Sequence, residues 1–260
     1  MSVEQPSVNI AELTEHIRVL EERLEQTQRL TALGELVGTT THEFNNILMT
    51  ILNYAKMGLR HQDDETRQKA FEKILAAAER ASKVTSTILG VARNRKPSLE
   101  PTDLASLVDD ALLLLEREMT KYRVRVEKVF VPVPEIIADG NRIQQVLVNL
   151  FINARQAMPD GGRLVVKIVP SSQNGMVELT VRDFGCGIPK DKLSRIFDLY
   201  FSTKSGPDAS GKGGSGLGLA LCKKVIEEHH GRIRVESAIG KGTAFTLTFP
   251  AAESETAQAG

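Results

Sequence analysis

The chain has 260 residues, 41% hydrophobic and 25% charged, which is ordinary for a soluble globular protein of one large or two modest domains. Its 33 Lys and Arg residues balance 33 Asp and Glu residues, which gives no electrostatic case for a nucleic-acid or membrane-surface partner. No apolar run of membrane-spanning length and no secretory leader occurs, so we expect neither. Cys186 and Cys222 form no metal-ligand pattern, and we expect reduced thiols in a cytoplasmic protein.

The first segment with a regular pattern is predicted to be a coiled coil. Its apolar residues alternate in steps of three and four and are separated by charged residues, which is the spacing of a coiled-coil seam. They are Ile10, Leu13, Ile17, Leu20 and Leu24. The seam breaks at Thr27 and restarts one residue early at Leu30, a slip that changes the supercoil winding locally.

Two long helices are predicted next. The first continues to about Met57 and Gly58, and after a short polar connection the second runs from about Glu65 to Arg95, with Asp63 or Asp64 able to cap it. Helices joined this closely are expected to lie antiparallel as a hairpin. A single hairpin cannot bury its apolar stripe, so we predict that two copies pair into a four-helix bundle and that the protein is a homodimer.

Beyond Pro97 and Pro101 the pattern mixes strands and helices. This order predicts an α/β sandwich, with a mixed sheet and helices on one face. The expected helices are Leu104–Met119, Asn141–Met158 and one ending near His230, and the expected strands are Arg123–Val131, Ile136–Ala138, Leu164–Val169, Met176–Val181, Arg232–Glu236 and Thr243–Phe249. A glycine-rich stretch over residues 185–218 shows little regular pattern.

A cluster of reactive polar residues lies in the first long helix. His42 and Asn46 are four residues apart and share a helix face, and Glu43 can reach a ring nitrogen of His42. A histidine held beside a carboxylate is well placed to act as a nucleophile. The alternative is an ordinary surface or structural histidine.

A pair of amides occurs in the expected helix Asn141–Met158. Asn149 and Asn153 project from one face amid apolar neighbours, and amide oxygens are hard ligands that suit Mg²⁺. The alternative is hydrogen bonding at the helix surface.

Two glycine-rich segments follow. Asp183 ends a strand, and Gly185 and Gly187 let the backbone approach a flat ligand, whose exocyclic amine could donate to a buried carboxylate. In Gly211–Ala220, a run of glycines comes directly before the expected start of a helix, where free N–H groups can bind phosphate. The spacing is not that of a P-loop. The alternatives are an Asp-led turn and a flexible linker.

In this order and spacing, the motifs resemble those of the sensor histidine kinases of two-component signalling. Their ATP-binding fold is shared with gyrase, heat-shock chaperone and mismatch-repair ATPases. The matching segments are His42–Asn46 (H box, most similar to that of nitrogen-regulation-type kinases), Asn149–Ala154 (N box), Asp183–Gly187 (G1 box), Ile196–Lys204 (F box of the ATP lid) and Gly214–Leu219 (G2 box).

The resemblance implies a role for each matching residue. His42 would accept the γ-phosphoryl group of ATP, Glu43 would fix its tautomer, and Asn46 would orient water to dephosphorylate a response regulator. Asn149 and Asn153 would hold Mg²⁺, and Asp183 would contact the adenine amine. The nucleotide would also be contacted by Gly185, Gly187, Gly214, Gly216, Leu217 and Gly218. Phe197 and Phe201 would anchor the lid or simply pack.

One departure concerns the cation that faces the phosphates. Many family members have a Lys followed by an aromatic residue just after the N box, where this chain has Gln156 and Ala157. Charge on the transferred phosphoryl must still be stabilised. Lys204 and Arg155 are the candidates.

The resemblance implies a dimeric, cytoplasmic, ATP- and Mg²⁺-dependent protein-histidine kinase that transfers its phosphoryl group to a receiver-domain Asp. We expect a tail and coiled coil over 1–29, a dimerisation and phosphotransfer domain over 30–96, a catalytic ATP-binding domain over 97–250 and a disordered tail over 251–260. A sensor input would lie outside this chain, and neither nucleic acid nor a membrane span is expected. The alternatives are a gyrase-like ATPase and a catalytically silent scaffold that docks a regulator.

Overall fold

The structure is a computed structural model that describes residues 13–16, 19, 23, 44–92, 98–173, 175–198, 200–201, 216 and 218–252, with the backbone alone at 83 and 86–92. Apart from Leu13, the predicted coiled-coil seam lies outside these residues. So do His42, Glu43 and the C-terminal tail from 253. In the part of the chain that is described, no helix is both long and apolar enough to cross a bilayer.

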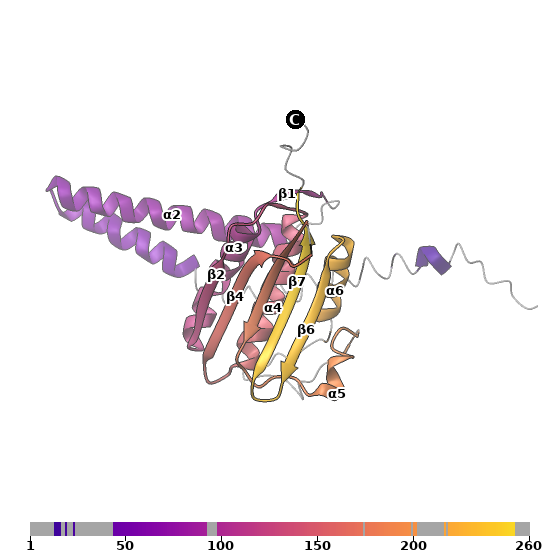
Figure 1. Cartoon of the computed structure of the whole chain (residues 1–260). Helices are drawn as coiled ribbons and strands as arrows, with labels where there is room; N and C mark the ends of the chain where they lie inside the picture. The colour runs from indigo at the N-terminus through magenta and orange to yellow at the C-terminus, as the bar shows by residue number, and fades with distance from the viewer. Residues whose placement is uncertain are drawn as a thin grey trace, which may run out of the picture.

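The predicted helical hairpin is present. Residues 44–60 are helical, and α2 (Asp64–Ala92) runs back beside them, so that the two form an arm leading away from the rest of the fold (Figure 1). Asp63 starts α2, because its Oδ1 accepts the backbone N–H of Thr66 at 2.8 Å. Hydrogen bonding to Thr66 is the main reason why the pKa of Asp63 is lowered.

The hairpin buries one stripe and exposes another. Ala70, Ala77 and Val84 follow each other at seven-residue intervals on α2 and are buried. A second set of large apolar side chains in the hairpin is exposed: Phe44, Leu48, Met49, Leu52, Leu59, Phe71 and Leu75. This much apolar surface on two helices is typical of a face that meets a partner.

The second half of the chain is an α/β sandwich, as predicted. Its five-stranded sheet has the order β2-β4-β5-β7-β6, in which β2 and β4 are parallel and the other pairs antiparallel. Helices cover one face of the sheet (Figure 1). The strands are β2 (Val124–Phe130), β4 (Gly162–Pro170), β5 (Met176–Asp183), β6 (Arg232–Ala238) and β7 (Gly242–Pro250), and the helices are α3 (Leu104–Lys121), α4 (Gly140–Ala157) and α6 (Gly218–Glu228).

Three short elements complete the fold. β1 (Glu100–Thr102) pairs antiparallel with β3 (Ile136–Ala138) in a separate two-stranded sheet, and α5 (Lys190–Leu193) is a single turn of helix. The sequence analysis predicted β3 but neither β1 nor α5. Both missed elements are too short to show a periodicity.

The core lies between the sheet and its three helices. Alternate residues of the central strands point inward and are buried, as the period of two requires. Each fully buried apolar side chain of this size contributes about 1.5–3 kcal/mol to folding. Central examples are Leu164, Ile168, Leu179, Leu247 and Phe249 from the sheet and Val108, Leu115, Leu147 and Leu150 from the helices.

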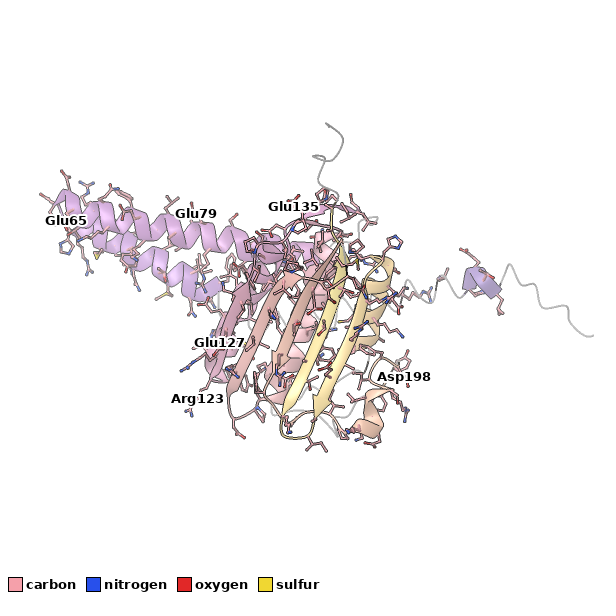
Figure 2. All side chains as sticks on the ribbon, in the orientation of Figure 1. Glu65, Glu79, Arg123, Glu127, Glu135 and Asp198 are labelled. Carbon is pink, nitrogen blue, oxygen red and sulfur yellow. The ribbon has the colours of Figure 1, made fainter. Side chains whose placement is uncertain are left out.

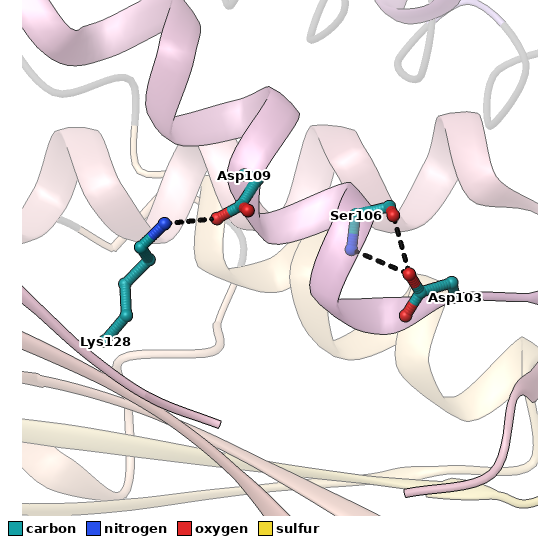
Figure 3. A network of polar contacts seen from close by, with 4 residues as sticks. All are labelled: Asp103, Ser106, Asp109 and Lys128. Atoms are coloured by element: carbon teal, nitrogen blue, oxygen red, sulfur yellow. Dashed lines mark hydrogen bonds and ion pairs between the residues drawn. The ribbon is translucent and has the colours of Figure 1, made fainter. Parts of the chain in front are cut away.

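Polar contacts fix α3 at its N-terminus and along its side (Figure 3). Asp103 caps the helix by accepting the backbone N–H of Ala105 at 3.0 Å and the hydroxyl of Ser106 at 2.6 Å. The Ser106 hydroxyl is the main reason why the pKa of Asp103 is lowered. Lys128 on β2 reaches Asp109 at 2.9 Å and ties α3 to the edge strand of the sheet.

The arm and the sandwich are in contact at one end of α2. Here α2 packs on α3 and α4, and Arg80 pairs with Glu116 of α3 at 2.5 Å. Figure 2 shows how far the arm extends from this contact, with Glu79 partway along it and Glu65 at its far end. The pair is largely exposed, so we attribute the junction mainly to apolar packing around Val84.

A buried histidine fixes α6 against the start of α4. His229 Nε2 accepts the backbone N–H of Asp139, the N-cap residue of α4, at 3.0 Å, and its Nδ1 lies 2.7 Å from the carbonyl of Val225. A carbonyl can only accept, so Nδ1 carries the proton. Beside it Arg142 of α4 pairs with Glu228 of α6. These contacts hold α4 against α6, the helices that carry Asn149 and Gly218.

Candidate active site

The candidate residues of the sandwich come from the end of β5, the middle of α4 and the start of α6. Asp183 is the last residue of β5, Asn149 and Asn153 lie on α4, and Gly218 is the first residue of α6. The helices α4 and α6 pack directly on each other, and α4 also contacts β5. The fold therefore brings Gly218 against the amide of Asn149, 69 residues earlier in the chain, and places the loop after Asp183 against Ala157 at the end of α4.

Asp183 is a carboxylate held in place inside the fold. It is 4% exposed, and its Oδ1 accepts the backbone N–H groups of Gly185 at 2.9 Å and Thr243 at 3.2 Å. Burial raises the pKa of Asp183, although both hydrogen bonds act against this shift. Since both contacts fall on Oδ1, the other carboxylate oxygen can accept a hydrogen bond from a ligand.

The loop after Asp183 lies so close to other backbone that side chains have no room. A Cβ at Gly185 would lie 2.3 Å from the carbonyl oxygen of Ala157, and one at Gly187 would lie 2.1 Å from that of Ala238. Gly187 also has a φ of +72°, which glycine adopts at little cost. Cys186 fixes the loop on both sides, donating from N to Ala157 and accepting from Gly240 N.

A network from the closing hairpin supports the same loop, and the sequence analysis did not find it. Ser237 Oγ accepts the N–H of Ile188 at 2.8 Å and lies 2.9 Å from both the Gly242 carbonyl and Thr243 Oγ1. Thr243 in turn donates its backbone N–H to Asp183. Ser237 and Thr243 lie about 50 to 60 residues after the loop, and nothing in their local sequence marks them.

Asn149 is held between α4 and α6. Its Nδ2 donates to Cys222 Sγ at 3.5 Å, and a Cβ at Gly218 would lie 2.6 Å from both Nδ2 and Oδ1. Gly218 therefore packs directly on the amide group. The first N–H groups of α6, which have no acceptor within the helix, begin at this point. Asn153, one turn further along α4, is half-buried.

The glycine-rich segment meets the F-box segment. Gly216 has a φ of +68°, and a Cβ there would lie 2.4 Å from the carbonyl carbon of Tyr200. Phe201 is half-buried against the core and has the guanidinium of Arg195 over its ring at 4.7 Å. Phe197 also packs against the core. Lys204, Gly214 and Leu217 lie outside the described residues.

Of the two candidate cations, Arg155 has partners at α3. Arg155 Nε lies 3.7 Å from Glu118 Oε2, and its guanidinium lies over the ring of Tyr122 at 4.7 Å. Glu118 lies on α3 and Tyr122 is the C-cap residue of that helix, so Arg155 links α4 to α3. Lys204 remains the candidate for the phosphates.

The site suits a magnesium–adenine nucleotide. A buried carboxylate can accept from the exocyclic amine of adenine, and glycines leave the close approach that a flat base needs. In the described part of the chain, no group of three or more His, Cys, Asp and Glu residues could hold a metal. The oxygen donors at hand are the amides of Asn149 and Asn153, and Mg²⁺ completes such a set with phosphate oxygens and water.

Two protein-family models match consecutive parts of this chain. A family model of histidine kinase-, DNA gyrase B- and HSP90-like ATPases matches residues 138–253. A model of the His Kinase A (phospho-acceptor) domain matches residues 32–97, immediately before it. The chain belongs to the sensor histidine kinases. The chain thus matches a phospho-acceptor domain and an ATPase domain in the order that the motifs predicted.

Curated relatives agree with the family. The kinase is 32% identical over 235 residues to the sensor histidine kinase ZraS of Escherichia coli (strain K12), covering 90% of the chain and 49% of ZraS. It is 34% identical over 243 residues to the C4-dicarboxylate transport sensor protein DctS of Rhodobacter capsulatus, covering 90% of the chain and 36% of DctS. The chain thus spans half or less of these relatives.

Solved structures show the same fold. The mycobacterial sensor histidine kinase MprB matches with a TM-score of 0.52 and 29% identity, covering 60% of the chain and 99% of the solved one. The histidine kinase ThkA, solved in complex with the response regulator protein TrrA, matches with a TM-score of 0.50 and 26% identity, covering 90% of the chain and 66% of ThkA.

Of the H box, the structure describes the C-terminal part. His42 and Glu43 fall inside the matched phospho-acceptor domain but outside the described residues. Asn46 is exposed, and its carbonyl accepts the hydroxyl of Thr50 at 2.9 Å within the helix. Ile47, its neighbour, is 4% exposed and packs in the core of the hairpin. The Asn46 side chain is therefore accessible to another protein.

Proposed function

We propose that this protein is an ATP-dependent protein-histidine kinase that phosphorylates His42 and passes the phosphoryl group to an Asp of a response-regulator receiver domain. The observation that carries the proposal is the combination, in one chain, of a matched phospho-acceptor domain that includes His42 with a matched ATPase domain that buries the carboxylate of Asp183. A nucleotide site alone would fit many ATPases, whereas the domain before it supplies an acceptor.

The proposed step is an in-line displacement. A lone pair of the His42 ring attacks the γ-phosphorus, the bond to the β,γ-bridging oxygen breaks, and ADP leaves. The carboxylate of Glu43 accepts a hydrogen bond from the N–H of the other ring nitrogen. The proton is thereby held there, and the attacking nitrogen stays unprotonated. Asp183 holds the adenine, and Asn149 and Asn153 hold Mg²⁺, which neutralises charge on the phosphates when bound. Lys204 supplies further positive charge. The remaining nucleotide contacts come from Gly185, Gly187, Gly214, Gly216, Leu217 and Gly218.

The proposal includes the assembly and domain division expected from the sequence. Two hairpins would form a four-helix bundle through the exposed stripe that includes Phe44, Leu52 and Phe71. We assign residues 1–29 to a tail and coiled coil, 30–96 to dimerisation and phosphotransfer, 97–250 to the ATP-binding domain and 251–260 to a tail. The kinase would work in the cytoplasm, with its input supplied by another domain or protein. The related histidine kinase ThkA was solved in complex with the response regulator protein TrrA, which supports a response regulator as the partner.

Incubation with γ-labelled ATP and Mg²⁺ tests the kinase proposal. We expect the wild-type protein to carry a label that is acid-labile and alkali-stable, as a phosphohistidine is, and His42→Gln to carry none. His61→Gln is the matched control, because His61 is exposed in the turn of the hairpin and should leave labelling unchanged. ATP hydrolysis without any protein label would favour a gyrase-like ATPase, and nucleotide binding with neither would favour a docking scaffold.

Asn46 is assigned a second activity, dephosphorylation of the regulator. Its exposed side chain lies four residues after His42 in the sequence, where an amide can orient water toward a docked phospho-Asp. We expect Asn46→Ala to keep labelling of His42 and to lower the rate of regulator dephosphorylation at least about tenfold. Loss of the phosphoryl group from the purified, prephosphorylated regulator measures this rate. Asn53→Ala, an exposed amide further along the helix, is the control, and an unchanged rate in Asn46→Ala would refute the assignment.

A further inference from the structure

Cys222 is a buried thiol that touches the metal-binding side of α4. It lies on α6, is 1% exposed, and has two polar neighbours on α4. Its Sγ accepts the Nδ2–H of Asn149 at 3.5 Å and lies 3.9 Å from the carbonyl oxygen of Val146. Neither the sequence motifs nor the assignment of Mg²⁺ to Asn149 gives this cysteine a role.

The two contacts determine the direction of both hydrogen bonds. The carbonyl of Val146 can only accept, so the single thiol proton of Cys222 points to it. The sulfur is then an acceptor toward Asn149 and requires the NH₂ group rather than the carbonyl group of that amide.

The amide also has little room to turn. Gly218 packs against it so closely that a Cβ there would lie 2.6 Å from both amide heavy atoms. The two helices that form this contact are joined by the bond from Asp139 to His229 and by the Arg142–Glu228 pair. Asn149 is therefore confined on one face by α6 and anchored at Nδ2 by Cys222.

We propose that Cys222 is a positioning residue, whose thiol selects the orientation of the Asn149 amide in which Oδ1 faces the magnesium ion of the nucleotide. This inference rests on the proposed function, because it requires Asn149 to be a Mg²⁺ ligand. An amide rotated by half a turn would present two N–H donors to the cation, which repels them. Without the thiol, the two orientations would be closer in energy. The orientation that cannot bind the metal would then be populated, and the observed affinity for Mg²⁺ would fall.

Plain packing is the alternative role for a buried cysteine, and substitution can separate the two. Cys222→Val fills the space but can neither accept from Asn149 nor donate to Val146. Cys222→Ser keeps both abilities, because a hydroxyl donates once and accepts. Val225→Ala is the packing control, since it removes buried volume from the next turn of α6 and leaves Asn149 its partner.

The experiment measures how strongly Mg²⁺ assists nucleotide binding. The affinity of each variant of the 260-residue chain for a non-hydrolysable ATP analogue is determined by calorimetry with Mg²⁺ and with a chelator, and the ratio of the two affinities is compared. We expect Cys222→Val to lower the ratio about tenfold with its metal-free affinity unchanged, and Cys222→Ser and Val225→Ala to keep it. A wild-type ratio in folded Cys222→Val would overturn the proposal. A wild-type protein whose binding ignores Mg²⁺ would instead refute the metal assignment itself.

A spectroscopic measurement covers the case in which Cys222→Val does not fold. In the ¹⁵N spectrum of the wild-type protein, the side-chain NH₂ of Asn149, identified by its loss in Asn149→Asp, should shift in Cys222→Ser, because the acceptor changes from sulfur to oxygen. Resonances of Asn141, an exposed amide at the start of the same helix, should stay in place. An unshifted Asn149 resonance would show that the thiol does not hold the amide.

Discussion

An Asp183→Asn variant should bind ATP at least about 100-fold more weakly than the wild-type kinase, because a donor replaces an acceptor opposite the adenine amine. The amide oxygen can keep the two hydrogen bonds that Asp183 Oδ1 accepts from Gly185 and Thr243. The new NH₂ group then takes the place of the second carboxylate oxygen and meets the adenine N–H donors. Calorimetric titration with the ATP analogue measures the loss.

The same variant should change the preferred base. Guanine has an acceptor, O6, where adenine has its amine, so the NH₂ group that Asp183→Asn introduces suits guanine better. We expect GTP to bind more tightly to the variant than to the wild-type protein. The ratio of ATP affinity to GTP affinity should therefore fall by a larger factor than the ATP affinity does. Asp191→Asn is the control, since Asp191 is exposed on α5. Unchanged ATP affinity in Asp183→Asn would remove Asp183 from the base site.

Without nucleotide, Asp183→Asn should be more stable than the wild-type protein at neutral pH. A stable variant would exclude unfolding as the cause of its weaker ATP binding. Burial raises the pKa of Asp183 above its unfolded value of 3.8, so the folded state holds this proton more tightly than the unfolded state. The carboxylate therefore lowers the free energy of unfolding as the pH rises from 3.8 through the folded pKa, and the whole cost is present above both pKa values. Urea unfolding should show the gain at neutral pH and none below both pKa values.

The sequence made the general form of this site predictable. Asp183 comes at the end of a strand with strict alternation, and glycines follow it, so a carboxylate beside an open loop could be expected without a structure. Asn149 and Asn153 were likewise found from their four-residue spacing on an apolar helix. These signals are local, because the residues that produce them lie within a few positions of each other.

The supporting contacts were not predictable, because they join segments far apart in the chain. Gly242 looks like an ordinary hairpin glycine, yet a Cβ there would lie 2.0 Å from the Asp183 carbonyl oxygen. Thr243 donates to the Asp183 side chain, and Cys222 accepts from Asn149 across two helices. Each contact depends on how β7 pairs with β5 or how α6 packs on α4, and a single sequence does not specify that packing. The same holds for Arg155, whose partners Glu118 and Tyr122 belong to α3 and its C-cap.

A Gly187→Ala variant should lose about 3 kcal/mol of unfolding free energy and most of its nucleotide affinity. Two effects add at this position. Its φ of +72° costs a residue with a Cβ about 1–2 kcal/mol, and that Cβ would lie 2.1 Å from the carbonyl oxygen of Ala238. The obstacle is strand backbone, which cannot move aside as a flexible side chain would, so the loop must shift away from Asp183.

Gly240 provides the matched control for this change. It has a φ of +71°, but no atom lies within 4 Å of where its Cβ would be. Gly240→Ala therefore carries the conformational strain without the clash, and we expect a loss of about 1 kcal/mol with nucleotide affinity retained. Urea unfolding and nucleotide titration of both variants measure the difference. Equal losses would mean that strain alone accounts for Gly187, whereas the larger loss there would show that the close approach of the loop to β6 holds the adenine site in shape.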